Sequence, residues 1–500
     1  MSDHSSRCHG PWLWRLSALA LTALAACSTQ QDVQPSVHAL DTNKLGVQAA
    51  AATDASEQAT IWWEAYGDAQ LNALIKQALG DNPSILVTQT RLQRAVAAET
   101  YARGNDLPQI QASGEVDRQR FSTHGMYPPP LAGSQWTSGT LQLEGSWELD
   151  LFGKRRAELE SAVGQSRAAR ADLQAARLLL SSQVARTYLQ LGRLQAQREV
   201  SVRTLAQREE MLSLIKQRVQ AGLDTNVELK QGEGALPDVR LQIEALDEQI
   251  TLTRHALAAL TGQAPGALDQ LQVKLEAVQP QPMPDRIPVD LLARRADVMA
   301  SLWRVEASGQ QVSAARALFY PDVDLVSYAG YNAIGLEQLL KASSLQWGLM
   351  PAIHLPLFDG DRRRANLQGK VAEQDAAQAS YNQTVLQAVQ EAADQIASTQ
   401  SVTRQRQEQQ AAQQSAEAAY QLARERYQAG LGGCLNVLSA ESAVLAQRRN
   451  AVDLQARALD TQFNLIRALG GSLQSPSFSA AIASPSQDHK PGTTQAGDRS

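Results

Sequence analysis

The sequence predicts a mainly helical protein that also contains a small β part and is built from a duplicated unit. Short stretches recur in the same order about 210 residues apart, and in each copy an alternating apolar/polar run is followed by a long helical run without proline. Alternation with period two is typical of a strand, whereas long runs rich in Ala, Gln, Arg and Leu favour a helix. Each unit is therefore predicted to hold a strand hairpin and a long helical hairpin.

The duplication is carried by four pairs of landmarks. They are "NPSI" (82–85) with "RADV" (295–298), "LPQI" (107–110) with "YPDV" (320–323), "WELDLFGKRR" (147–156) with "IHLPLFDGDRRR" (353–364), and "RVQAGL" (218–223) with "RYQAGL" (426–431). Four matches in register indicate a repeat that is too long for a solenoid unit. We assign 61–279 to the first repeat and 280–470 to the second, with a Pro-rich stretch near the joint and a disordered tail over 471–500.

The strands follow a proline in each repeat. Residues 84–106 and 297–319 are helix-forming and stop just before that proline, which disfavours continuing a helix. Alternating runs then predict strands at about 109–121 and 136–151 in the first repeat, and at about 322–334 and 345–358 in the second. The chain is thus expected to hold two strand hairpins.

The long helices come directly after the second strand of each hairpin. They are predicted at about 154–219 and 363–428, each about 100 Å long at 1.5 Å per residue. After "AGL" a second helix is predicted at about 226–260 and 435–469. The Gly of each "AGL" marks a turn, so each pair of helices forms a tall hairpin.

The N-terminus has the features of an export signal. Arg7 and Arg15 precede an apolar run that is too short to cross a bilayer, which predicts a signal peptide over 1–26. The run ends in "LAAC", which resembles the lipobox of bacterial lipoproteins, so Cys27 is expected to be acylated and to open a lipidated tether over 27–60. Ser28 follows, and in such lipoproteins a residue other than Asp at this position implies sorting to the outer membrane.

Composition argues against several classes of function. The net charge of −5 does not favour a nucleic-acid partner held by general basicity. The His are scattered, and the sequence contains no metal-spaced His/Cys/Glu cluster, phosphate-binding Gly loop or nucleophile elbow. We therefore expect no enzymatic activity, no cofactor and no metal. Cys434, which would be the single thiol left after processing, is interpreted as a packing residue.

Strands with an apolar face in an exported chain suggest a transmembrane β-barrel. Four strands cannot close one, because open edges in lipid would leave backbone N–H and C=O groups unsatisfied at several kcal/mol each. Several chains must therefore pool their strands. The charged residues of the long helical runs recur too often for these helices to cross a membrane themselves.

Taken together, these motifs resemble the outer-membrane efflux protein family of TolC-like exit ducts, in particular its lipidated, NodT-type branch. The resemblance covers about residues 60–470 and includes "LAAC", "WWEAYGDAQL" (62–71) and the repeated landmarks. It implies a homotrimer with a 12-strand barrel in the outer membrane and a 12-helix tunnel through the periplasm. The implied function is a passive duct through which an inner-membrane pump, coupled by a periplasmic adaptor, expels small molecules such as drugs.

The resemblance also assigns roles to residues at the hairpin ends. It implies that the adaptor docks on the turns formed by Ala221, Gly222 and Leu223, and by Ala429, Gly430 and Leu431. Each Gly is also interpreted as a helix C-cap, and the two roles are compatible.

The periplasmic gate departs from the family pattern. Some members carry acidic residues just past the second turn, where this chain has Asn436 and Ser439. Glu228, the equivalent of Asn436 in the first repeat, supplies one carboxylate per chain. We therefore expect a less charged constriction.

The alternative interpretation is a lipid-anchored periplasmic coiled-coil tether or an adaptor protein. Long helical hairpins fit such a protein as well. An adaptor built on soluble β-domains would have more strands and shorter helices. The strand hairpin at the same place in both repeats therefore favours the duct.

Overall fold

The computed structural model describes residues 33–40, 57–281 and 295–471, with the side chains of 57–60 left aside. The predicted signal peptide, Cys27, most of the tether and all but the first residue of the predicted tail lie outside these residues. The chain divides into two compact units, which are described separately. Unit 1 holds residues up to 40, 86–173 and 297–386, and unit 2 holds 41–85, 174–296 and 387 onward.

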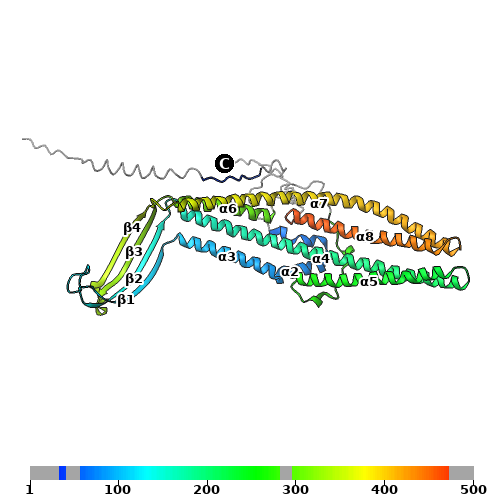
Figure 1. Cartoon of the computed structure of the whole chain (residues 1–500), viewed down its shortest axis with the longest axis horizontal. Helices are drawn as coiled ribbons and strands as arrows, with labels where there is room; N and C mark the ends of the chain where they lie inside the picture. The colour runs from blue at the N-terminus through cyan, green and yellow to red at the C-terminus, as the bar shows by residue number, and fades with distance from the viewer. Residues whose placement is uncertain (1–32, 41–56, 282–294, 472–500) are drawn as a thin grey trace, which may run out of the picture. The chain divides into compact units, whose positions relative to one another are not determined.

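Unit 1 contains a four-stranded antiparallel sheet in the order β1-β2-β3-β4 (Figure 1). Its strands are β1 Gln109–Arg120, β2 Gln135–Leu149, β3 Asp322–Ile334 and β4 Leu345–His354, with short 3-10 turns at Leu336–Gln338 and Ala342–Ser344 between the last two. The pairs β1–β2 and β3–β4 are the hairpins of the two repeats. The structure adds the pairing of β2 with β3, which joins the repeats into one sheet.

Two strands end two or more residues before the bound that the sequence predicts. The predicted strand 345–358 stops at His354, because its neighbour β3 begins at Asp322, the partner of His354. Pro356 beyond it also has no N–H to donate to a ladder. The predicted strand 136–151 runs from Gln135 to Leu149, after which the N–H of Leu151 turns back to the carbonyl of Leu149 at 2.9 Å.

Register sorts the sheet into two faces. One face carries mostly apolar residues, since Leu143 is paired with Ala112 and Ala329, and Ala329 with Trp347. The adjacent positions place polar residues on the other face, where Glu144 accepts hydrogen bonds from Gln111 at 2.8 Å and Ser113 at 3.0 Å. The apolar face is largely uncovered, with Ile110, Leu143, Trp147, Trp347 and Ile353 all exposed.

Helices of unit 1 pack closely through small residues. α3 spans Pro83–Asn105 and α6 spans Ala296–Ala317, and they are accompanied by the first parts of α4 (Lys154–Gln220) and α7 (Arg362–Gln428). A Cβ placed on Gly164 would lie 2.9 Å from the Cβ of Ala307, so glycine is required for α4 to approach α6. Val312, Ala315, Leu367 and Val371 form a buried cluster between α6 and α7.

Gly330 of β3 leaves no room for a side chain beside β2. A Cβ at this position would lie 2.3 Å from the carbonyl oxygen of Leu141. We expect Gly330→Ala to destabilise the sheet by about 1–3 kcal/mol, because the strands must separate to admit the methyl group. Thermal unfolding followed by circular dichroism measures this, with Gly114→Ala as the matched control, since its added Cβ meets a side chain at an ordinary 3.7 Å. Equal midpoints for the two variants would contradict the expectation.

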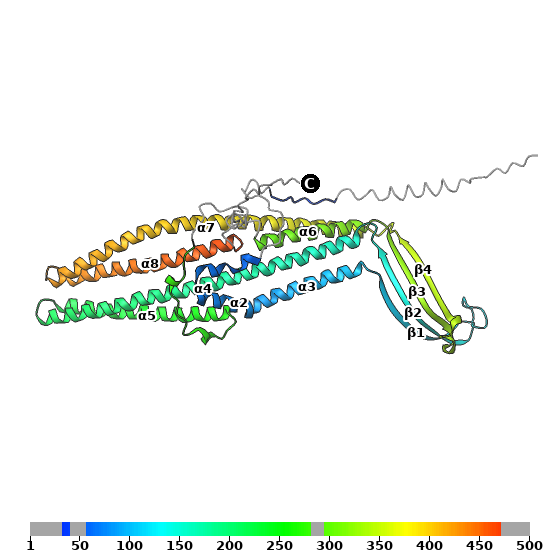
Figure 2. The same ribbon diagram turned by 180° about the vertical axis from the view of Figure 1, so that it is seen from behind.

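Unit 2 contains the remaining parts of α4 and α7, together with α5 (Asn226–Leu260) and α8 (Cys434–Ala468). The sequence predicts these helices within two residues of their bounds. Shorter elements are the 3-10 segment η3 (Glu57–Tyr66), α2 (Ala69–Asp81), η4 (Pro265–Leu268) and η5 (Leu275–Ala277). Figure 2 shows α4 with α5 and α7 with α8 lying side by side as two hairpins. Among the residues that the structure describes, no helix combines the length and the apolar content of a membrane span.

The "WWEAYGDAQL" segment is tied into the helices of unit 2. Trp62 donates to Ser181 Oγ at 3.1 Å, and the rings of Trp62 and Tyr66 pack edge-on against Phe463. Asp68 caps α2 by accepting from Leu71 N and also accepts from the Tyr188 hydroxyl at 2.7 Å. These contacts hold α2 and η3 against α4 and α8.

Candidate functional site at the hairpin tips

The two turns of unit 2 share one backbone design. Gly222 and Gly430 have φ values of +71° and +76°, which a residue with a side chain rarely adopts. In each turn the following leucine donates back across the helix end, Leu223 to Arg218 O at 2.9 Å and Leu431 to Arg426 O at 2.8 Å. This is the Schellman motif, so each predicted tip is a helix C-cap. The motif leaves Leu223 and Leu431 65% and 71% exposed.

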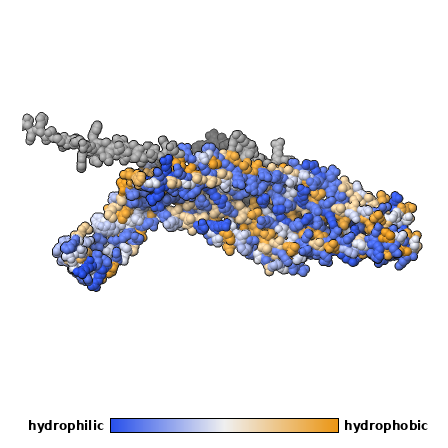
Figure 3. Space-filling model, viewed as in Figure 1, coloured by the Kyte–Doolittle hydropathy of each residue, from blue (hydrophilic) through white to orange (hydrophobic). Residues whose placement is uncertain are grey.

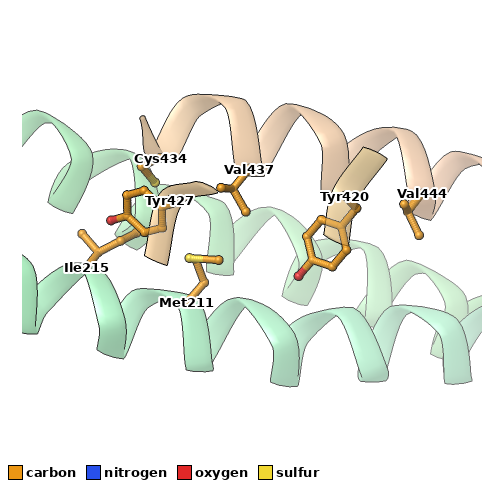
Figure 4. Packing of buried hydrophobic residues seen from close by; sticks show 7 residues of the cluster. All are labelled: Met211, Ile215, Tyr420, Tyr427, Cys434, Val437 and Val444. Carbon is orange, nitrogen blue, oxygen red and sulfur yellow. The ribbon is translucent and has the colours of Figure 1, made fainter. Parts of the chain in front are cut away.

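Below the turns, the two hairpins share a hydrophobic core. Figure 4 shows Met211 and Ile215 of α4 beside Tyr427, with Val437 of α8 nearby. The buried members are Met211, Ile215, Tyr420, Tyr427, Cys434, Val437 and Val444. Cys434 thus packs as the sequence predicts. Burial raises the pKa of its thiol to about 11, so the sulfur stays protonated at neutral pH.

Asp224 links the end of the first hairpin to the second. It follows Leu223 in the α4–α5 turn, accepts a hydrogen bond from the Tyr427 hydroxyl of α7, and pairs with Arg218 Nε at 3.0 Å. The guanidinium of Arg218 also lies over the Tyr427 ring, 4.7 Å from its centroid. Asp224, Arg218 and Tyr427 therefore all contact one another, and we call this set of three residues the triangle between the two hairpins.

The contacts in this triangle shift the pKa values of Asp224 and Tyr427 in opposite directions. Burial by itself would raise the pKa of Asp224, but hydrogen bonds from Arg218 and Tyr427 outweigh it and hold that pKa below 3.8. Burial, followed by the hydrogen bond to Asp224, raises the pKa of Tyr427. At neutral pH Asp224 is therefore the charged acceptor and Tyr427 the neutral donor.

The three residues assigned to the gate lie near these turns in different settings. Glu228 closes a capping box at the start of α5, accepting from the Thr225 backbone N–H at 2.9 Å and from its hydroxyl. The Thr225 hydroxyl is the main cause of its lowered pKa. Asn436 and Ser439 lie in the first turns of α8, one helical turn apart, and both are exposed.

A buried ion pair lies further along the same two hairpins. Arg208 of α4 donates to Glu441 of α8 at 2.8 Å and to the carbonyl of Ala235 at 2.8 Å. Burial raises the pKa of Glu441, and the contact with Arg208 opposes that rise. Removing one partner of such a pair leaves the other charge buried and uncompensated.

Sequence reasoning missed the triangle, although the repeat contains a signal for it. "RVQAGLD" and "RYQAGLG" differ where the triangle forms, since Val219 matches Tyr427 and Asp224 matches Gly432. Each copy thus supplies the partner that the other lacks. Comparing the copies for their differences finds both residues, but the contact itself requires the fold. No group of side chains that could hold a metal ion occurs among the described residues.

The comparisons with known proteins agree with this architecture. The profile of the outer membrane efflux protein family matches residues 74–263 and 287–471. The putative multidrug resistance outer membrane protein MdtQ of Escherichia coli K12 is 32% identical over 422 residues, 83% of this chain and 88% of that protein. The fusaric acid resistance protein FusA of Burkholderia cepacia is 36% identical over 360 residues, 70% of this chain and 68% of that protein.

Solved structures show the same fold. The outer membrane protein VceC of Vibrio cholerae aligns with a TM-score of 0.79 and 35% identity, covering 83% of this chain and 99% of that one. The outer-membrane channel OprN aligns with a TM-score of 0.78 and 28% identity, covering 89% and 100%. A mainly helical chain with a small sheet is thus the fold that this chain shares with these outer-membrane proteins. The chain belongs to the outer membrane efflux protein family, as an outer-membrane exit duct for efflux.

Proposed function

We propose that three copies of this chain form the duct. The sheet supports this trimer. Its β1 and β4 edges have no partner strand among the described residues, and its apolar face is exposed. Three such sheets give a closed barrel of 12 strands, which removes the open edges that lipid does not tolerate. The apolar face then meets lipid and the polar face lines the pore. The four long helices of each chain form a 12-helix periplasmic tunnel.

The duct is a passive element of a tripartite pump. The exposed tips, Ala221–Leu223 and Ala429–Leu431, are the docking points for a periplasmic adaptor, which connects the duct to an inner-membrane pump. Leu223 and Leu431 offer apolar anchors of the kind that protein interfaces bury. Because MdtQ is named a multidrug resistance protein and FusA a fusaric acid resistance protein, we propose small drug-like molecules as the exported class. The duct itself carries out no bond chemistry.

The gate lies just inside the tips. The Asp224–Tyr427–Arg218 triangle joins the two hairpins of one chain, and in this proposal it is the contact that keeps the entrance closed. Glu228 contributes one carboxylate per chain, whereas Asn436 and Ser439 contribute none. The constriction is therefore less charged than in members with acidic residues at those positions.

The duct sits in the outer membrane and is also anchored by lipid at Cys27. An N-terminal strap, residues 33–40, supports this because it is held against α7 in unit 1. Asp375 accepts from the backbone N–H groups of Ser36 and Val37 at 2.9 and 3.0 Å, and Asn382 accepts from Leu40 N at 3.2 Å. The strap thus ties the chain to α7 a few residues after Cys27.

Electron microscopy of the detergent-purified mature protein, combined with conductance in planar bilayers, tests this function. We expect a hollow three-fold particle with a detergent belt at the sheet and ion conductance after reconstitution. A solid rod without a belt or conductance would overturn the proposal and favour the lipid-anchored tether.

A further inference from the structure

Apolar side chains are exposed where the sheet of unit 1 meets its helices. Leu357 and Phe358, between β4 and α7, are 79% and 91% exposed. Leu151 and Phe152, between β2 and α4, are exposed as well, and Phe152 stacks on Tyr320 with ring centroids 4.9 Å apart. In Figure 3 hydrophobic surface gathers at this junction, next to strongly hydrophilic surface. Soluble proteins rarely expose several large apolar side chains together, and such a group indicates a site of interaction.

Basic residues follow these apolar residues in both repeats. α4 begins with Lys154, Arg155 and Arg156, and α7 begins with Arg362, Arg363 and Arg364. One half of these charges is already neutralised. Lys154 and Arg155 pair with Glu148, and Arg363 pairs with Asp359 at 2.7 Å.

The other half faces solvent. Arg156, Arg362 and Arg364 are exposed, and within the described ranges no carboxylate lies within ion-pair distance of their guanidinium groups. Guanidinium groups match phosphate with two parallel N–H donors. Three exposed arginines, of which Arg362 also interacts with the charge of Asp359, therefore lie beside four exposed apolar side chains and present an amphipathic surface.

The register of the sheet brings together the residues that follow β2 in the first repeat and those that follow β4 in the second. Leu149 at the end of β2 is paired with Val323, and His354 at the end of β4 is paired with Asp322. β2 and β4, which flank β3, therefore end at the same end of the sheet. Two strand spacings correspond to about 10 Å, which is the width of one or two lipid headgroups. The exposed residues of the two repeats therefore follow strands that end side by side.

The N-terminal strap arrives at the same junction. Val33 and Phe319 each pack against the α6–α7 cluster, and the guanidinium of Arg363 lies 5.5 Å from the centroid of the Phe319 ring. Cys27 precedes Val33 by six residues, which span at most about 20 Å when extended.

We propose that this junction is a binding seat for anionic phospholipid, in which Arg156, Arg362 and Arg364 bind headgroup phosphates while Leu151, Phe152, Leu357 and Phe358 enter the acyl region. The bound leaflet is the one that faces the helices. The inference rests on the proposed membrane insertion of the sheet and adds a lipid preference to it. Free phosphate would satisfy the arginines alone and leaves the exposed phenyl and leucine side chains without a role.

Native mass spectrometry of the detergent-purified full-length protein tests the seat. Phosphatidylglycerol is titrated against phosphatidylethanolamine, using the wild type and a variant with Arg156→Gln, Arg362→Gln and Arg364→Gln. Each arginine near an anionic surface is worth about fivefold in binding, so the variant should lose most of the preference for phosphatidylglycerol. The control replaces three other exposed arginines, Arg91, Arg404 and Arg406, by Gln and should keep the preference.

Two further arms identify the cause of any loss. Lysine at the same three positions keeps the charge and should restore most of the preference, which separates a folding defect from a lost headgroup contact. Inorganic phosphate should displace the lipid no more than chloride of equal ionic strength. Equal lipid preference in the Gln variant and the wild type, or displacement by phosphate alone, would overturn the seat while leaving the duct intact. A wild type that binds neither lipid and carries no detergent belt would overturn both.

Discussion

Replacing Leu223 and Leu431 together by Asp should abolish drug resistance conferred by the assembled pump. Both side chains are exposed at the hairpin tips, where the proposed adaptor contact would have to bury them. A carboxylate in a buried apolar contact costs at least about 2 kcal/mol, so the two together should weaken docking by roughly three orders of magnitude. Minimum inhibitory concentrations in cells that carry the matching pump, together with adaptor cross-linking, measure the effect.

The matched control introduces the same charges elsewhere. Met126 and Leu340 lie in the loops between the strands of unit 1 and are at least as exposed as the tip leucines. Met126→Asp with Leu340→Asp should leave resistance unchanged. Full resistance in the tip variant, at normal levels of protein in the outer membrane, would contradict the docking assignment.

Removing the Asp224–Tyr427 contact should open the proposed gate. A hydrogen bond to a charged group contributes about 1.5–3 kcal/mol, so Asp224→Ala or Tyr427→Phe should raise the open population at least about tenfold. The remaining apolar core around Ile215 and Val437 keeps the hairpins folded. Single-channel recordings measure the open probability, and Asp238→Ala, an exposed carboxylate on α5, serves as the control.

Low pH should have the same effect on the gate as Asp224→Ala. The folded pKa of Asp224 lies below its ordinary value of 3.8, so the contact contributes its full stability above that value and loses it as the pH falls further. Open probability in the wild type should therefore rise only below about pH 4, whereas Asp224→Ala should show no such rise. An identical acid response in both proteins would exclude Asp224 as the titrating group.

The sequence by itself determined the local elements and their order. Proline after each short helix, alternation in the strand runs and glycine after each long helix act within a few residues, so their consequences can be derived without the fold. The same holds for the Schellman turns at Gly222 and Gly430. The capping box of Thr225 and Glu228 also has a sequence signature, Thr followed by Glu three residues later, which the assignment of Glu228 to the gate overlooked.

Only the tertiary structure decided how the repeats meet. The pairing of β2 with β3 and the link from Asp224 to Tyr427 join residues about 180 or more positions apart, and the early end of β4 follows from where its neighbour β3 begins. Periodicity carries no information about such partners, because it fixes which face a side chain occupies and not which strand or helix lies opposite. The continuous apolar face, the triangle at the tips and the arginine seat at the junction exist because two similar but unequal copies lie side by side.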